Sequence, residues 1–212
     1  MILAYDAMSH HPPLPSTTPR KQPRQRRSTV TVAAILEAAA RILETTGYDG
    51  YTTNAVAARA GVSVGSLYQY FPNRDAITRA LIEQESSALL SDILAMPVHA
   101  DGLEGVRALL AIAVHHQLRR PRLARFLDAE EARLPASAEL QHNGERAAAV
   151  LRGCLERTGL EKEALAHTAV RDVMAITRGM VDSAGSHGET DEQALLLRVT
   201  AAVGGYLTAM AK

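Results

Sequence analysis

The sequence predicts an all-α protein, and three observations lead to that fold class. Ala and Leu dominate the 212 residues, whereas aromatic residues make up only 4% of them, a composition that favours helices over sheets. Apolar residues recur three or four positions apart in segment after segment, which is the spacing of one helix face. No segment shows the strict alternation that is typical of a half-buried strand. With 47% apolar residues, the chain can bury the core of one domain or of two small ones.

The net charge is zero, but the charges are unevenly distributed. Residues 1–80 hold nine Lys and Arg against five Asp and Glu, and residues 81–212 hold fourteen against eighteen. Much of the positive excess comes from five residues near the N-terminus, namely Arg20, Lys21, Arg24, Arg26 and Arg27. Residues 1–27 are rich in Pro, Ser and Thr and lack a helical period, so we expect a disordered basic arm. Such an arm suits a polyanion such as DNA, although a merely solvated tail has the same composition.

The sequence also indicates the compartment. Cys154 is the single cysteine, so an intrachain disulfide is impossible and a reducing compartment fits. The N-terminus lacks an apolar leader segment, and no run of about 18 uncharged apolar residues follows. We therefore expect a soluble cytoplasmic protein without a membrane partner.

The helices can be placed from periodicity and from their end signals. The first is expected over 30–46, ending at Gly47. Its apolar face consists of Ile35, Ala39, Ile42 and Leu43. Residues 48–51 are expected to form a turn-like link. Two short helices follow over 53–60 and 63–70, and later helices are expected near 73–95, 103–119, 122–133, 137–158, 162–184 and 191–211, the first of these capped by Asn73.

The two short helices have the features of a helix-turn-helix pair. Because such helices cross closely, their contact residue must be small, and Ala57 meets that requirement. The turn between them needs a positive φ, which Gly61 adopts without a steric penalty. Val62 lies beneath the turn, and the Ser63 hydroxyl can cap the second helix by accepting a backbone hydrogen bond.

The same segment separates an apolar face from a polar one. The buried face is expected to hold Val56, Ala60, Val62, Leu67 and Tyr70. The other face of the second helix presents Val64, Ser66, Tyr68 and Gln69. That face is short and polar enough to enter a DNA major groove, whereas a generic helical hairpin is the alternative interpretation.

The stretch 47–77 resembles the N-terminal signature of the TetR/AcrR family of regulators. The matching residues are Thr52-Thr53, Ala60-Gly61-Val62-Ser63, Gly65, Leu67-Tyr68, Tyr70-Phe71 and Arg74. Arg74 departs from the family pattern, in which Lys is commoner at that position. The resemblance implies a helix-turn-helix DNA-binding domain over 28–80 and a larger helical ligand-binding and dimerisation domain over 81–212. It also implies a homodimeric transcriptional regulator, a repressor that a small-molecule effector releases from its double-stranded DNA operator.

The resemblance assigns DNA contacts by position. They are Thr53, Asn54, Ser63, Val64, Gly65, Ser66, Tyr68, Gln69, Tyr70 and Arg74. Gln69 is the best candidate for a base-edge contact, since its amide can pair with adenine through two hydrogen bonds. Val64 could meet a thymine methyl group, and Arg74 would hold a phosphate. For Tyr70, packing within the helix pair is an equally good interpretation.

The last helix carries an apolar stripe and an internal Gly204-Gly205 pair. Each Gly lowers helix stability by roughly 1 kcal/mol, which close approach of another helix would justify. The resemblance implies that the last two helices pair with their symmetry mates in a four-helix bundle. The expected interface residues are Val173, Thr177, Met180, Leu195, Val199, Val203, Tyr206 and Met210. A purely intrachain core stripe is the alternative.

We call the helix-turn-helix helices over 53–60 and 63–70 the reading pair, and the domain that contains them the reading domain. The helices between the reading pair and the expected dimer interface have the composition of an apolar cavity with a few polar groups. The candidate ligand contacts are His115, Gln117, Phe126, His142, Met174 and Arg178. The acidic and basic side chains of Asp128, Glu130, Glu131 and Arg133 are interpreted as a solvated face. His115 and His116 are adjacent and point to different faces, so no metal site is expected, and no cofactor either.

Two other classes of function fit the sequence less well than a regulator does. An enzyme is disfavoured because the sequence holds neither G-x-S-x-G, nor H-E-x-x-H, nor a Gly-rich phosphate loop. A helical interaction module without DNA affinity is disfavoured by the basic arm beside a helix-turn-helix. The sequence thus predicts a non-enzymatic, ligand-responsive DNA-binding protein.

Overall fold

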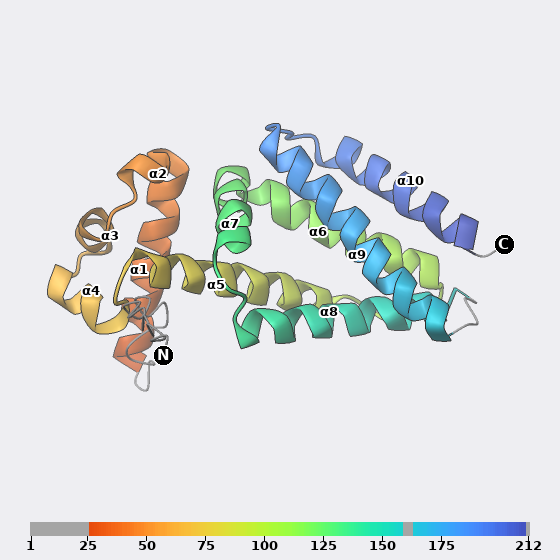
Figure 1. Cartoon of the computed structure of the whole chain (residues 1–212), viewed down its shortest axis with the longest axis horizontal. Helices are drawn as coiled ribbons and strands as arrows, with labels where there is room; N and C mark the ends of the chain where they lie inside the picture. Colours follow the sequence, from red (N-terminus) through yellow and green to blue (C-terminus); the bar gives the residue numbers. More distant parts are fainter. Residues whose placement is uncertain (1–25, 159–162, 211–212) are drawn as a thin grey trace, which may run out of the picture.

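A computed structural model describes residues 26–158 and 163–210, and this part of the chain is helical without a strand (Figure 1). Helices α1 to α4 form a compact group at one end of an elongated molecule, and α6, α8, α9 and α10 form a layered bundle at the other. The elements are α1 (Arg26–Thr45), α2 (Gly47–Gly50), α3 (Thr53–Ala60), α4 (Val64–Tyr70), α5 (Arg74–Ala95), α6 (Gly102–Arg119), α7 (Pro121–Arg133), α8 (Ala138–Glu156), α9 (Glu163–Ser186) and α10 (Glu192–Met210).

The expected helices are confirmed, with two corrections near the N-terminus. The link expected at 48–51 contains a one-turn helix, α2, because Gly47 takes φ +68° and reverses the chain directly after α1. Helix α1 begins at Arg26, so the last two residues of the expected arm are helical. The remaining arm, residues 1–25, lies outside the described residues.

The N-terminal core is built on the face of α1 that periodicity predicted. Ile35, Ala39, Ile42 and Leu43 are buried, together with apolar side chains of α3, α4 and the first turns of α5. Leu123 and Leu127 of α7 join the same core. The N-terminal group is therefore packed against a helix that comes much later in the chain.

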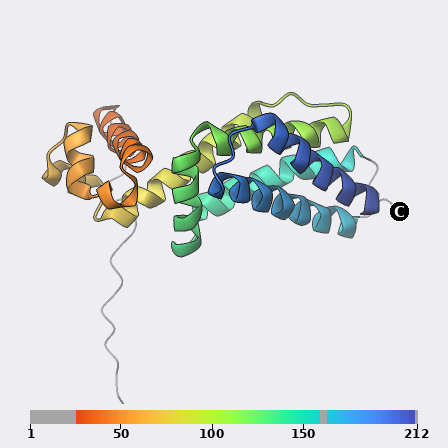
Figure 2. The ribbon, with the colours of Figure 1, turned by 90° about the horizontal axis from the view of Figure 1, so that it is seen from above.

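Helix α5 connects the two ends of the molecule without a break (Figure 2). Asn73 caps it, since its Oδ1 accepts a hydrogen bond from the Ala76 amide at 2.9 Å. The boundary expected near residue 80 falls inside this helix. Ala76 and Ile77 pack in the N-terminal core, whereas Leu90 and Ile93 are buried farther along the same helix. One rigid element thus passes from the reading pair into the larger helical domain.

The second core lies between α6, α8, α9 and α10. Its buried side chains include Val114, Leu155, Val173 and Val199. None of the helices in the described residues is long and apolar enough to cross a membrane.

Candidate nucleic-acid interface and interior cavity

Local hydrogen bonds fix the geometry of the helix-turn-helix pair. Thr52 caps α3, its hydroxyl accepting from the Ala55 amide at 3.1 Å. Gly61 ends α3 in the left-handed conformation (φ +68°, ψ +28°), as its place in the turn predicts. The Ser63 hydroxyl then accepts from the Ser66 amide at 3.0 Å and starts α4. These short-range signals set the crossing of the two helices.

The buried face of the pair is the expected one. Val56, Ala57 and Leu67 are completely buried, which confirms the small contact residue at position 57. Ala60, Val62 and Tyr70 are partly buried and pack against the same core. The packing interpretation of Tyr70 therefore has direct support.

The opposite face of α4 is open to solvent. Ser63, Gly65 and Gln69 are exposed, and Val64 and Tyr68 each expose 39% of their surface. The Tyr68 hydroxyl lies 3.2 Å from the Thr53 hydroxyl, which links the two helices on the solvent side. Asn54 is exposed beside this face, and Ser66 and Thr53 are half-buried. The structure thus brings the predicted contact residues of α3 and α4 together on one surface.

Arg74 is held by two tyrosines at the start of α5. Its guanidinium carbon lies 4.3 Å from the centroid of the Tyr48 ring, a cation–π arrangement. The same group donates hydrogen bonds to the Tyr48 hydroxyl and, at 3.5 Å, to the Tyr51 carbonyl. Arg74 is therefore a half-buried part of the domain wall, positioned beside the α4 surface.

Part of the expected dimer interface is wrong. Val173, Leu195, Val199 and Val203 are each buried to 1% exposure or less within one chain, so they form the intrachain core and cannot contact a second copy. The alternative interpretation of the stripe was correct for these residues.

The other expected interface residues have intrachain neighbours as well. The Tyr206 hydroxyl donates to Asp172 Oδ2 at 2.8 Å, and the Thr177 hydroxyl donates to the Val173 carbonyl at 2.7 Å. Met180 and Met210 are half-buried. The outward face of α10 carries different residues, namely Leu197, Ala201, Ala202 and Gly205.

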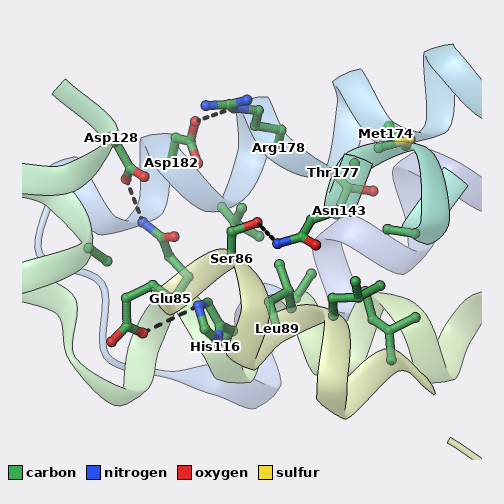
Figure 3. Close-up of a pocket in the computed structure, with 18 of the residues that line it drawn as sticks. Glu85, Ser86, Leu89, His116, Asp128, Asn143, Met174, Thr177, Arg178 and Asp182 are labelled. Atoms are coloured by element: carbon green, nitrogen blue, oxygen red, sulfur yellow. Dashed lines mark hydrogen bonds and ion pairs between the residues drawn. The ribbon is translucent and has the colours of Figure 1, made fainter. Parts of the chain in front are cut away.

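A cavity of about 510 Å³ lies in the larger domain and is lined by helices α5 to α9 (Figure 3). Leucines from four helices make up much of its apolar wall: Leu89, Leu90, Leu109, Leu110, Leu123 and Leu151. Of the expected ligand contacts, Gln117, Met174 and Arg178 line it. Its size and composition fit a small organic molecule.

Three expected ligand contacts do not line the cavity. His115 exposes 62% of its side chain and lies 3.3 Å from Glu192, while its neighbour His116 faces inward. His142 is exposed, and the adjacent Asn143 lines the wall instead. Phe126 packs against the rings of Tyr48 and Tyr51. Adjacent helix residues point about 100° apart. An error of one position in the sequence therefore replaces a residue of the cavity wall with a residue on the exposed side of the helix.

The solvated face expected on α7 is wrong for Asp128 and Glu131, since both line the cavity. Asp128 accepts a hydrogen bond from the buried Gln117 amide at 2.9 Å, and burial raises the pKa of its carboxyl to about 6. Their spacing from Ala124 and Leu127, which also line the wall, was a signal that could have revealed them. Glu130 and Arg133 do not line the cavity and instead pair with each other at 2.6 Å, the Glu130 side chain being only 13% exposed.

Polar groups on the other walls are arranged in pairs. Asn143 donates to the hydroxyls of Ser86 and Ser87 at 3.3 and 3.1 Å. His116 Nε2 lies 3.6 Å from Glu85, while its buried Nδ1 has no hydrogen-bond partner in the part of the chain that the structure describes. Burial lowers the pKa of His116, which favours a neutral imidazole at this wall.

Comparison with known proteins agrees with this architecture. Residues 35–81 match the family described as "Bacterial regulatory proteins, tetR family". The nucleoid occlusion factor SlmA of Vibrio atlanticus is 37% identical over 95 residues, 44% of this chain and 48% of that protein. SlmA of Shewanella pealeana is 34% identical over 97 residues, 45% of this chain and 49% of its own length. The chain thus spans about half the length of the curated relatives it matches.

Solved structures extend the likeness to most of the chain. A TetR transcription regulator from Haloarcula marismortui has a TM-score of 0.70 at 19% identity, covering 86% of this chain and 98% of that one. The fatty acid degradation regulator FadR from Bacillus halodurans has a TM-score of 0.65 at 18% identity, with coverages of 86% and 95%. At this identity the likeness concerns the fold. The helix-turn-helix domain at residues 35–81 thus matches the tetR family of bacterial regulatory proteins, and the fold of the described chain is that of TetR transcription regulators.

Proposed function

We propose that this protein is a cytoplasmic homodimeric transcriptional repressor that a small molecule releases from its DNA operator. The observation that carries the proposal is the course of α5. Its first residue, Arg74, lies beside the α4 surface, and about three and four turns later Glu85 and Leu89 line the cavity. A displacement of the cavity wall would therefore move the proposed DNA-reading helix.

The DNA side of the proposal rests on the open face of α4. We propose that Gln69 contacts a base edge, that Val64 meets a thymine methyl group, and that Tyr68 contacts the backbone. Thr53, Asn54, Ser63, Ser66 and Arg74 would position the pair on phosphates, and Gly65 would let the backbone approach the groove. Residues 1–25 would add sequence-independent contacts through Arg20, Lys21 and Arg24.

The dimer rests on the outward faces of α9 and α10. Leu197 is an exposed apolar side chain there, with 72% of its surface in solvent. A Cβ added to Gly179, Gly204 or Gly205 would meet no atom within 4 Å, so packing within the chain does not account for these glycines. Approach of a second copy would account for them, and it would place two α4 helices on one side of the DNA, about 34–36 Å apart.

Helix α7 gives the cavity a second route to the reading domain. Arg120, which precedes α7, pairs with Glu44 of α1 at 2.6 Å, and Arg133 pairs with Asp75 at 2.8 Å. On its cavity side the same helix carries Leu127 and Asp128. A ligand that favours a different position of α7 would weaken DNA binding, and by linkage DNA would weaken ligand binding by the same factor.

Operator binding is testable with DNA from upstream of the chain's own gene. We expect the full chain to retard this fragment, with an affinity that falls steeply as salt increases. Deleting residues 1–25 should reduce the slope of log affinity against log salt because fewer phosphates are neutralised. Equal binding to any DNA fragment would contradict a specific operator, and an unchanged slope would contradict the role of the arm.

Two substitutions separate base reading from backbone contact. Gln69→Ala should relax the preference at one or two operator positions, with a loss of about 1–3 kcal/mol against the best site. Tyr68→Phe should weaken all sequences alike, because a backbone contact carries no sequence information. Selection from a randomised operator library measures both effects. An unchanged base preference of the Gln69 variant would refute its assignment.

A further inference from the structure

One end of the cavity holds more acidic than basic side chains. Asp128 and Glu131 come from α7 and Asp182 from α9, and all three line the wall. Figure 3 shows Asp128 and Asp182 at the same end of the cavity. A single guanidinium, that of Arg178, stands among them, 3.0 Å from Glu131 and 3.4 Å from Asp182. When all four groups are ionised, this end carries two uncompensated negative charges.

Among the described residues, Asp128 has no cationic partner of its own. The groups that face it are Gln117 on α6, Glu131 on its own helix, and Arg178 and Asp182 on α9. Gln117 donates a hydrogen bond from a neutral amide, and Arg178 is already shared between the two other carboxylates. A half-buried carboxylate without a cationic partner is less stable in its ionised form than one beside a positive charge.

The other cationic groups of the wall are engaged elsewhere. Arg120 forms its short ion pair with Glu44, at 2.6 Å, on the side of α1. His116 is 3.6 Å from Glu85, which itself pairs with Arg119. No further Lys or Arg lines the cavity among the described residues. Within the described residues, the excess negative charge at this end of the cavity therefore has no further cationic partner.

We propose that the cavity binds an amphipathic organic cation, with its ammonium or amidinium group beside Asp128 and Asp182 and its apolar body along the leucines of α5, α6 and α8. Leu89, which lies across the cavity from Asp182 in Figure 3, belongs to this apolar wall. The proposal deepens the proposed function and rests on it, because it names the chemical class of the effector.

An anionic amphiphile is the natural rival. It would have to detach Arg178 from Glu131 and Asp182, or Arg120 from Glu44, while bringing a like charge toward the carboxylates. A cation requires neither change. It also stabilises the ionised form of Asp128, which burial disfavours.

The class of ligand can be tested on the full chain with three probes that share a ten-carbon tail. These are decyltrimethylammonium, decanoate and decanol, each used below its micelle-forming concentration. We expect decyltrimethylammonium to bind most tightly in calorimetry and to raise the melting temperature most. Tighter binding of decanoate would overturn the proposal.

Variants identify the carboxylate that holds the cation. Asp128→Asn should weaken the binding of decyltrimethylammonium about tenfold or more, which is the change in affinity that corresponds to a shift of one unit in the pKa of Asp128. The same substitution should leave decanol binding unchanged. Glu145→Gln, at an exposed position of α8 outside the wall, is the matched control and should behave as wild type. Asp182→Asn should also weaken the cation and serves if the first variant fails to fold. Unchanged cation affinity in the folded variants would refute the site.

The pH dependence gives an independent readout, since the probe keeps its charge at every pH. Its affinity for the wild type should fall as the pH is lowered through about 6, because Asp128 takes up a proton, and this fall should be absent in Asp128→Asn. A pH-independent affinity would contradict the proposal.

Operator release, measured separately, distinguishes this inference from the proposed function. If decanoate alone released the operator, the proposed ligand-controlled regulation would stand and the proposed cationic ligand would be refuted. If the cation bound with the expected dependence on pH and on Asp128 but left operator binding unchanged, the ligand class would stand and the proposed regulation would be refuted.

Discussion

The ring of Phe126 on α7 meets the ring of Tyr51 edge-on, with centroids 5.8 Å apart and planes at 82°. Tyr51 is completely buried in the N-terminal core, and its hydroxyl lies 3.1 Å from that of Thr78. The residues that follow Phe126, Leu127 and Asp128, line the cavity. One turn of α7 therefore contacts the cavity on one side and the aromatic cluster of the reading domain on the other.

Phe126→Ala should reduce the effect of a ligand on DNA. Because Phe126 is half-buried, the loss in the free energy of unfolding should stay below the roughly 3–5 kcal/mol of a fully buried Phe→Ala. Operator affinity should be measured without ligand and with saturating decyltrimethylammonium. The ratio of these two affinities should be closer to one in the variant than in the wild type. Leu103→Ala, at an exposed position of α6, is the control. A ratio equal to that of the wild type would show that α7 does not transmit the signal.

Gly65→Ala should separate helix stability from DNA affinity. The new Cβ would meet only the Ser63 hydroxyl, at 3.9 Å, so α4 should gain up to about 1 kcal/mol from the better helix former. Operator affinity should nevertheless fall, because the methyl group projects from the exposed face that we propose enters the groove. Urea unfolding and fluorescence anisotropy measure the two effects.

Gly153→Ala is the matched control on α8, where the added Cβ is 3.7 Å from an Arg157 nitrogen. It should stabilise its helix and leave DNA binding unchanged. If Gly65→Ala bound the operator as well as Gly153→Ala does, close approach of the α4 backbone to DNA would be ruled out.

Leu197→Glu and Val203→Glu should have different effects although both lie on α10. Leu197 exposes 72% of its surface and Val203 only 1%. The first change should give a folded monomer in light scattering, since it places charge in the proposed contact between copies. The second should unfold the chain in circular dichroism because it buries an unpaired charge. A Leu197→Glu chain that remains dimeric would move the interface away from this face.

Asp128→Asn should stabilise the protein in a pH-dependent way. The folded-state pKa of Asp128, about 6, lies above the ordinary value of 3.8. The folded state therefore holds this proton more tightly than the unfolded chain, and the free energy of unfolding declines as the pH rises through that interval. The variant should melt above the wild type near about pH 7.5, and the difference should shrink toward about pH 4. A constant difference would show that Asp128 does not titrate as its burial demands.

The sequence by itself determined the helices and the form of the reading pair. Gly61 and Ser63 act through their own backbone and through neighbours within three residues, and Asn73 caps α5 in the same way. Interactions between residues so close in the chain can be recognised from the sequence alone. The bounds of the helices and the buried face of α3 and α4 could therefore be predicted. The arm at 1–25 and the operator contacts stay predictions.

Only the tertiary structure decided which side of each later helix meets which neighbour. Helix α10 has three consecutive leucines, and packing buries Leu195, leaves Leu196 half-buried and exposes Leu197. The same choice turned His116 inward and His115 outward. Hydrophobicity has no direction, so a helix that is apolar on several sides specifies burial without specifying the partner. The acidic end of the cavity exists because α7 packs in the N-terminal core through Leu123 and Leu127 and also contacts α9, which brings Asp128 beside a helix some fifty residues away in the chain.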